Sequence, residues 1–108
     1  ARGLRTYDSQ AALEEAVQHD PRDVEAYLLL GDVELDRGSG FRALRAFQRA
    51  LTLAPDRAAP LWGVARAYEE AGERRVAVHH YKLYARSKAS DVDPALVRQA
   101  WLKVEGAI

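Results

Sequence analysis

Residues at positions i, i+3, i+4 and i+7 form one helical face twice along the chain. A glycine ends each of these helices, as glycine does just past a helix C-terminus, and a second helix follows each glycine. The pattern predicts an all-α fold built of helix–turn–helix units. The two faces comprise Tyr27, Leu30, Gly31 and Glu34, and then Leu61, Val64, Ala65 and Tyr68, with Gly38 and Gly72 as the terminating glycines.

The two units are copies of one another at a spacing of 34 residues. Each matched pair keeps its size class when the sequence is shifted by that length. Because one helix pair cannot bury its apolar face alone, such units stack into a solenoid. The matched pairs are Pro21 with Pro55, Leu30 with Val64, Gly31 with Ala65, Gly38 with Gly72, Ala43 with Ala77, and Phe47 with Tyr81.

The second helix of the first unit carries a small residue, an aromatic residue and another small residue, followed by a proline: Ala43, Phe47, Ala50 and Pro55. Together with the first-helix positions, this set resembles the tetratricopeptide repeat family. The resemblance implies a helix–turn–helix solenoid, a superhelix of about two full repeats. We expect these repeats at residues 24–57 and 58–91.

Two further segments complete the predicted single domain of residues 1–108. Residues 7–21 resemble an isolated second helix, with Leu13, Ala16 and Pro21 in place. Residues 93–106 predict a terminal capping helix, because Asp93 can cap it and Pro94 suits its first position. Its apolar face comprises Leu96, Val97, Ala100, Trp101 and Val104, and we expect Trp101 to be packed.

Four positions depart from the family's pattern. Glu34 stands where an aromatic is usual, Ser9 replaces a small apolar residue, and Ala89 stands where a proline is expected. Tyr84 replaces the second alanine of the last copy. Because tyrosine prevents the close approach that alanine permits, we expect the last helix pair to splay or to repack locally.

Charge is distributed unevenly although the formal net charge is zero. Residues 1–36 hold three basic and nine acidic side chains, a net −6, and residues 37–66 hold six arginines and one acid, a net +5. A general nucleic-acid binder would be basic overall, so no nucleic-acid partner is expected. The polarity is compatible with head-to-tail contact or with an oriented charged partner.

Composition adds little about location. No apolar run approaches the roughly 20 residues of a membrane span, so no membrane insertion is expected. The absence of cysteine fits a reducing compartment, which favours the cytoplasm and leaves the periplasm open. Because the chain begins with Ala1, we expect a processed protein or a piece of a longer one. Frequent alanine and arginine suggest a GC-rich, bacterial coding sequence.

The resemblance implies a concave groove lined by the first helices, which would bind a protein or peptide. Trp62 is the most informative position, because Leu61 fills the core and leaves Trp62 turned about 100° around the helix. It either anchors a peptide in the groove or packs on the neighbouring helix. The implied groove residues are Leu28, Leu29, Asp32, Leu35 and Asp36, followed by Trp62, Gly63, Arg66, Glu69 and Glu70.

The groove residues favour a peptide with apolar anchors and some basic residues. Some family members grip a terminal carboxylate here with lysine and asparagine, and only Arg66 could serve an anion in this chain. The stripe of Arg42, Arg45 and Arg49 is interpreted as a solvated convex face, because no aromatic residues are interleaved with it.

No pattern predicts catalysis, a metal site or a cofactor. His79 and His80 are adjacent, so on a helix they point about 100° apart and do not converge on one metal. A structural role is also expected for His19. The GSG stretch at residues 38–40 follows no strand and is interpreted as a turn, not a phosphate-binding loop.

Three functions follow from these observations. The preferred hypothesis is a non-catalytic interaction module that binds a partner segment in the groove. The second is an assembly module that self-associates through the uncovered half-repeat face around Leu13 and Val17. The third, implied by the resemblance, is a regulatory module appended to a signalling enzyme or an envelope-assembly factor.

Overall fold

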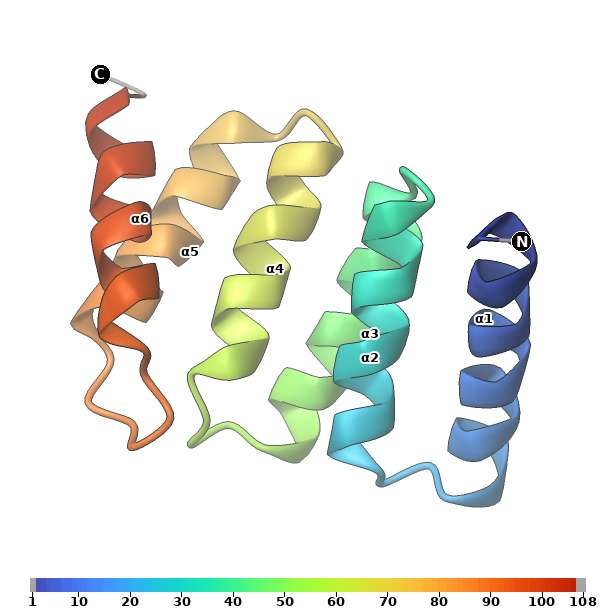
Figure 1. The fold of residues 1–108 in the computed structure, drawn as a ribbon. Coiled ribbons are helices and arrows are strands. Elements are labelled where there is room, and N and C mark those ends of the chain that lie inside the picture. Colours follow the sequence, from blue (N-terminus) through green and yellow to red (C-terminus); the bar gives the residue numbers. More distant parts are fainter. Residues whose placement is uncertain (1, 107–108) are drawn as a thin grey trace.

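Over residues 2–106, six helices stacked side by side form the fold (Figure 1). The structure is a computed structural model and describes residues 2–106. Within that range each helix packs on its chain neighbour, and α2 also packs on α4. The helices are α1 (Arg2–His19), α2 (Val24–Asp36), α3 (Gly40–Leu53), α4 (Ala59–Glu70), α5 (Arg74–Arg86) and α6 (Pro94–Gly106).

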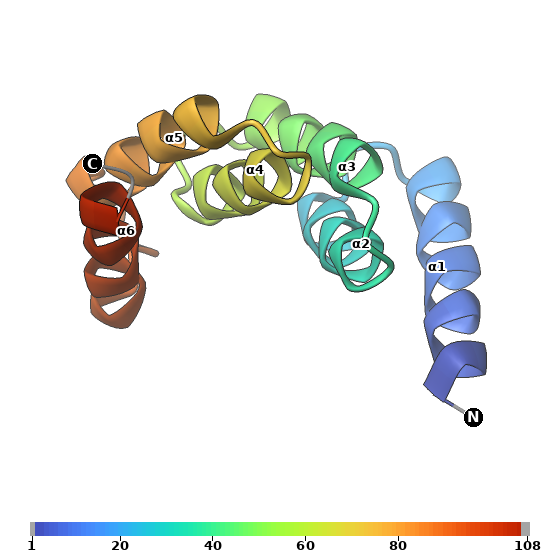
Figure 2. The ribbon, with the colours of Figure 1, turned by 90° about the horizontal axis from the view of Figure 1, so that it is seen from above.

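The stack is curved. Seen from above, the helices form an arch with α2 and α4 on its inner side and α3 and α5 on its outer side (Figure 2). The predicted all-α helical-repeat solenoid is thereby confirmed. Helices α2 and α3 lie within residues 24–57, and α4 and α5 within residues 58–91. The repeat boundaries themselves stay a prediction.

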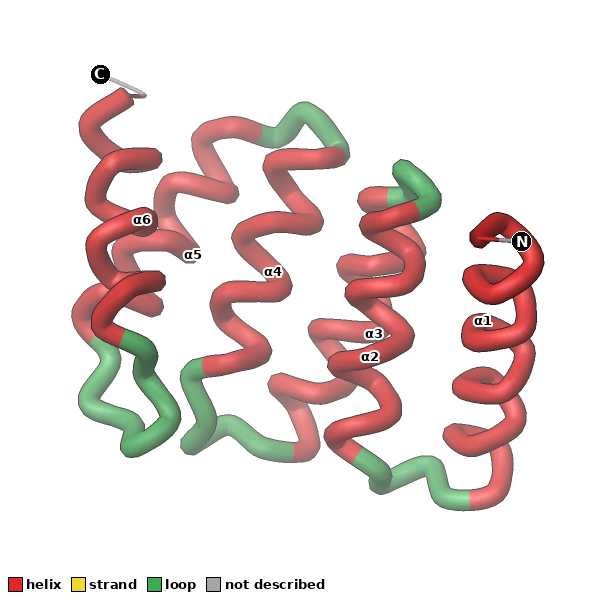
Figure 3. The backbone as a smooth tube through the Cα atoms, in the orientation of Figure 1, coloured by secondary structure: helices red, strands yellow, loops and turns green. Residues whose placement is uncertain are grey.

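Local sequence signals explain most helix ends. The Asp23 carboxylate accepts a hydrogen bond of 3.1 Å from the Ala26 N–H at the start of α2. Gly38 and Gly72 adopt φ of 75° and 84°, which side chains disfavour, and turn the chain into α3 and α5. Short loops join the helices, and the loop of residues 87–93 is the longest of them (Figure 3).

The first helix differs from its predicted bounds. It begins at Arg2, before the predicted start at Tyr7, and it ends at His19. No proline stands before Pro21, and a single glycine in a helix costs only about 1 kcal/mol. The helix therefore extends toward the N-terminus, and its end precedes the proline.

Phe47 joins the two central helix pairs. Its ring is 2% exposed and packs with Ala43, Leu44, Val64 and Ala67. Glycines stand on both sides of it: a β-carbon at Gly31 would lie 2.5 Å from ring carbons, and one at Gly63 would also overlap the ring. The ring thus fills the gap between α2 and α4. Any residue larger than glycine at position 31 or 63 would force the helices apart.

A second core cluster holds α6 against α5. It consists of Ala65, Ala77, Tyr81, Ala100 and Val104, with Trp101 partly buried beside it. The predicted apolar face of α6 is the one that packs, and the guanidinium of Arg86 lies 5.9 Å from the Trp101 ring centroid. The predicted packing of Trp101 is confirmed.

Tyr84 is accommodated by local repacking. Its side chain is 1% exposed, and its hydroxyl accepts a hydrogen bond of 2.8 Å from the Asp93 N–H. Asp93 also caps α6, since its carboxylate accepts from the Ala95 N–H at 2.9 Å. The tyrosine therefore ties the loop before α6 to α5.

Candidate partner-binding groove

Two hollows lie along the inner side of the arch, and we call them together the inner groove. The first has a volume of about 430 Å³ and lies between α2 and α4, and the second, of about 200 Å³, lies at their C-terminal ends. Arg66 borders both. The first hollow includes Leu28, Leu29, Asp32, Trp62, Gly63 and Arg66, and the second includes Leu35, Asp36, Arg66, Glu69 and Glu70.

The residues that the resemblance implied for the groove thus line one continuous surface. What binds there, and whether anything does, stays a prediction. Leu29 is the most exposed of its large apolar side chains, at 53%. An exposed leucine between acidic residues is the kind of surface that accepts an apolar side chain of a partner.

Trp62 packs on the neighbouring helix, whereas its predicted role as a peptide anchor stays a prediction. Its ring lies 5.2 Å from the Tyr81 ring and 5.3 Å from the Tyr84 ring, at steep interplanar angles of 68° and 58°. It is therefore anchored against α5 by edge contacts. The ring is only half-buried, however, and it also lines the first hollow.

The first hollow also contains residues that the sequence did not reveal. The loop of residues 87–93 returns to the start of α4, where the Asp91 carboxylate accepts from the N–H groups of Ala58 at 2.8 Å and Ala59 at 3.0 Å. Arg57 lies 3.7 Å from the same carboxylate and also pairs with Glu25. No periodic signal connects Asp91 with a helix start more than thirty residues earlier.

Asp91 is ionised in this setting. Burial opposes its ionisation, but the two backbone N–H donors and Arg57 outweigh that cost and hold the pKa of Asp91 below its usual value. For Asp32, burial dominates and raises the pKa, although Arg66 lies 3.2 Å away and favours the charged form. Of these two carboxylates, Asp91 is therefore firmly charged and Asp32 is easier to protonate.

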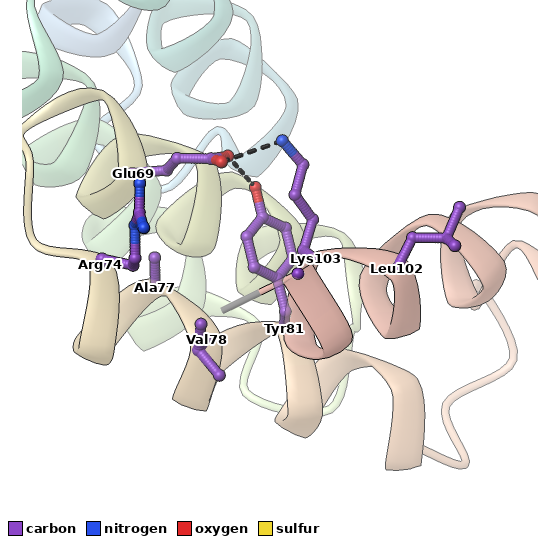
Figure 4. A pocket seen from close by; sticks show the side chains of 8 residues that line it. Glu69, Arg74, Ala77, Val78, Tyr81, Leu102 and Lys103 are labelled. Atoms are coloured by element: carbon purple, nitrogen blue, oxygen red, sulfur yellow. Dashed lines mark hydrogen bonds and ion pairs between the residues drawn. The ribbon is translucent and has the colours of Figure 1, made fainter. Parts of the chain in front are cut away.

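Glu69 is held by two hydrogen bonds. One oxygen accepts from the Tyr81 hydroxyl at 2.6 Å and the other from the Lys103 ammonium at 2.9 Å (Figure 4). Burial opposes ionisation of Glu69, and these donors outweigh it, so its pKa is lowered. Burial and the Glu69 charge raise the pKa of Tyr81. Glu69 therefore braces α4, α5 and α6.

The unpaired charge of the groove is acidic. Asp36 and Glu70 are exposed, and neither makes an ion pair within residues 9–106. Both basic side chains of the groove are already paired, Arg66 with Asp32 and Arg57 with Glu25. A basic partner segment would thus meet two carboxylates that make no ion pair within residues 9–106, whereas an acidic one would have to displace existing pairs.

The other candidate residues lie elsewhere. Leu13 and Val17 are half-buried, and Leu13 borders Leu29 and Val33 of α2 in a shallow hollow. The face predicted to be uncovered is thus partly covered by α2, which packs on α1. Self-association through it stays a prediction.

His79 and His80 lie on α5, and His19 is the last residue of α1. His80 lies within hydrogen-bonding distance of the Val76 carbonyl, 2.9 Å away, and the His79 and His80 rings are nearly perpendicular. His19 lies 4.0 Å from Glu15. In the part of the chain that the structure describes, no group of three metal-binding side chains comes together, and no helix is long and apolar enough to cross a membrane.

Comparison with known proteins finds similarity to a protein of a complex and to a receptor. The chain is 34% identical over 86 residues to Superkiller complex protein 3 of Mus musculus and 33% identical over 86 residues to that of Homo sapiens. It is 29% identical over 90 residues to the peroxisomal targeting signal receptor of Komagataella phaffii. No family model matches the chain.

The similarity covers most of this chain and a small part of each relative. The matches extend over 80% to 83% of the chain, which spans only 5% of the length of Superkiller complex protein 3 and 16% of that of the receptor. All three organisms are eukaryotes, so the bacterial origin suggested by composition gains no support. The chain is thus similar to a segment of a complex subunit and to a segment of a receptor.

Proposed function

We propose that the chain is a tetratricopeptide-type helical array that acts as a non-catalytic protein-interaction module. The two relatives are named as a complex component and a targeting-signal receptor, and both names describe binding to other molecules. The 34-residue repetition and the curved stack of helix pairs support the same proposal.

We infer further that the partner is an extended or helical peptide segment with apolar and basic side chains, bound in the inner groove. The observation that carries this is that the inner groove holds exposed Leu29 together with Asp36 and Glu70, whose carboxylates make no ion pair within residues 9–106. With about two repeats, the contact area is small. We therefore expect a dissociation constant near micromolar, which corresponds to a binding free energy of about −8 kcal/mol.

The test uses synthetic peptides of defined sequence that carry leucine and lysine or arginine at varied spacings. Fluorescence anisotropy would compare the wild-type protein with Asp36→Lys/Glu70→Lys. Because neither residue makes an ion pair within residues 9–106, the variant should keep its circular dichroism spectrum. Binding should weaken at least tenfold, about 1.4 kcal/mol or more.

A matched control is Glu73→Lys/Glu105→Lys, which makes the same charge change at exposed positions away from the inner groove. Equal loss of binding in the control would mean that only net charge matters. Undiminished binding by Asp36→Lys/Glu70→Lys would show that the peptide does not bind in the inner groove. Analytical ultracentrifugation of the same samples, with and without Leu13→Glu, tests the alternative of self-association.

A further inference from the structure

A larger cleft lies on the outer side of the arch, between α1 and α3, with α2 as its floor. Its volume is about 710 Å³. We call it the α1–α3 cleft. It shares no lining residue with the inner groove. Its walls include Glu14, Tyr27, Leu30, Glu34, Arg42, Arg45, Ala46, Gln48, Arg49 and Thr52.

Glu34 lies at the floor of this cleft and is 3% exposed. One carboxylate oxygen, Oε1, is 3.8 Å from the Arg37 guanidinium. The other, Oε2, is buried and has no hydrogen-bond partner in the structure. A buried acceptor without a donor is costly, and native proteins seldom keep one without a reason.

The second helix pair shows what this cleft lacks. At the 34-residue spacing, Tyr68 corresponds to Glu34 and His80 corresponds to Ala46. The Tyr68 and His80 rings pack together with their centroids 5.3 Å apart. In the first pair, a carboxylate and a methyl group replace these two rings, so an aromatic side chain is missing where the cleft opens.

Three arginines border the opening. Arg42, Arg45 and Arg49 are exposed, stand at i, i+3 and i+7 on α3, and make no ion pair within residues 9–106. Their counterparts in α5 are Val76, His79 and Leu83, so the basic edge belongs to this cleft alone. On the α1 side, Glu14 is engaged by the Gln10 amide at 3.1 Å.

We propose that the α1–α3 cleft binds an acidic, tyrosine-containing peptide segment of a protein partner. The tyrosine ring enters the part of the cleft that corresponds, in the first helix pair, to the space filled by Tyr68 and His80 in the second. There it packs against Tyr27 and Leu30. Its hydroxyl donates to the Glu34 carboxylate. Carboxylates that flank it pair with the arginines, whose planar guanidinium groups suit bidentate contact.

A tyrosine fits this cleft better than other anchors. Phenylalanine would fill the space but leave Glu34 without a donor, and lysine would bring a positive charge to an edge of three arginines. Tyrosine combines a large apolar ring with one polar end, which makes it a frequent anchor at interfaces. The stripe interpreted from sequence as a solvated face is thereby given a binding role.

The probes are capped peptides of about a dozen residues with a central tyrosine and glutamates three and four positions to either side, a spacing that places them on one helix face with the tyrosine. Matched peptides replace the tyrosine by phenylalanine or the glutamates by lysine. Fluorescence anisotropy should show saturable binding of the tyrosine–glutamate peptides, several-fold weaker binding of the phenylalanine version and none of the lysine version.

Arg42→Gln/Arg49→Gln should weaken binding at least tenfold. The matched control, Arg75→Gln/Arg98→Gln, removes two exposed arginines elsewhere and should bind as the wild type does. Equal loss in the control would overturn the proposal, because it would show attraction by net charge only. Failure of every tyrosine–glutamate peptide to bind the wild type would overturn it as well.

A second variant fills the cleft. Glu34→Tyr/Ala46→His installs the pair that α4 and α5 already accommodate, and it removes the buried unpartnered oxygen. We expect a folded protein with an unchanged or higher melting temperature and no peptide binding. Unchanged binding by this folded variant would place the peptide elsewhere and refute the proposal.

Two further outcomes separate this site from other possibilities. The groove variant Asp36→Lys/Glu70→Lys should bind the acidic peptides normally, so either proposal can fail without the other. If ultracentrifugation shows that copies of the chain associate and that Arg42→Gln/Arg49→Gln abolishes this association, the occupant is a second copy and the proposed peptide partner is wrong.

Discussion

Replacing Gly63 by alanine tests whether the Phe47 contact fixes the spacing of α2 and α4. Gly63 lies within α4, where alanine is intrinsically favoured over glycine by about 1 kcal/mol. A β-carbon there would overlap the buried Phe47 ring. The ring cannot retreat toward α2, because even a β-carbon placed on Gly31 there would lie 2.5 Å from ring carbons.

The two effects have opposite signs and unequal size. Inserting a methyl group into a tightly packed core costs about 1–3 kcal/mol, and clamping from two sides favours the upper part of that range. Subtracting the helical preference of alanine leaves a net destabilisation of about 1–2 kcal/mol. At about 4–8 °C per kcal/mol for a domain of this size, the melting temperature should fall measurably.

Urea unfolding followed by circular dichroism measures the change in the free energy of unfolding. Gly106→Ala is the control, because a β-carbon there would meet no side chain of the described residues within 4 Å, and it should cost nothing. Combining Gly63→Ala with Phe47→Leu should cost less than the sum of the single changes, since the smaller side chain relieves the overlap. A Gly63→Ala protein as stable as wild type would refute this account of the contact.

Three further predictions concern the end of the stack. Asp91→Ala should destabilise the fold by about 0.5–2 kcal/mol in urea unfolding, because it removes a helix cap. Since the folded-state pKa of Asp91 is lowered, its contribution is complete above the unfolded-state pKa and is lost as pH falls through the folded value, which acid titration of wild type against Asp91→Ala would show. Tyr84→Phe should cost about 0.5–1.5 kcal/mol, because the Asp93 N–H loses its hydrogen-bond acceptor. In an ultraviolet pH titration, Tyr81 should ionise above the ordinary tyrosine range, and Tyr81→Phe should remove that late step.

The fold was predictable because its determinants repeat along the chain. Glycines at the turns, small residues at close helix contacts and the aromatic Phe47 all recur at a fixed spacing, and each acts on residues nearby in sequence. The lining of the inner groove, in contrast, was implied by the resemblance to the tetratricopeptide repeat family. Contacts within one helix pair are local, so a pattern read along the chain describes them well.

The loop of residues 87–93 was not predictable in this way. Asp91 caps α4 through a contact with backbone groups that carry no residue-specific signal. The departure of Tyr84 from the pattern did mark the region, although its hydrogen bond to the Asp93 N–H depends on the final path of the loop. Glu34 was visible as a departure from the pattern too. Only the structure, however, shows that its Oε2 atom is buried without a hydrogen-bond donor.

The ion pairs between successive first helices give the stack a direction. Asp32 pairs with Arg66 and Glu69 pairs with Lys103, each across 34 residues, and in both the acid precedes the base. Exposed pairs of this kind add little stability. A shift of α4 by one helical turn, however, would move Arg66 away from Asp32 and bring the Glu70 carboxylate toward the Asp32 carboxylate, which would repel it. The ion pairs therefore specify the register of the stack, that is, which turn of one helix lies beside which turn of the next.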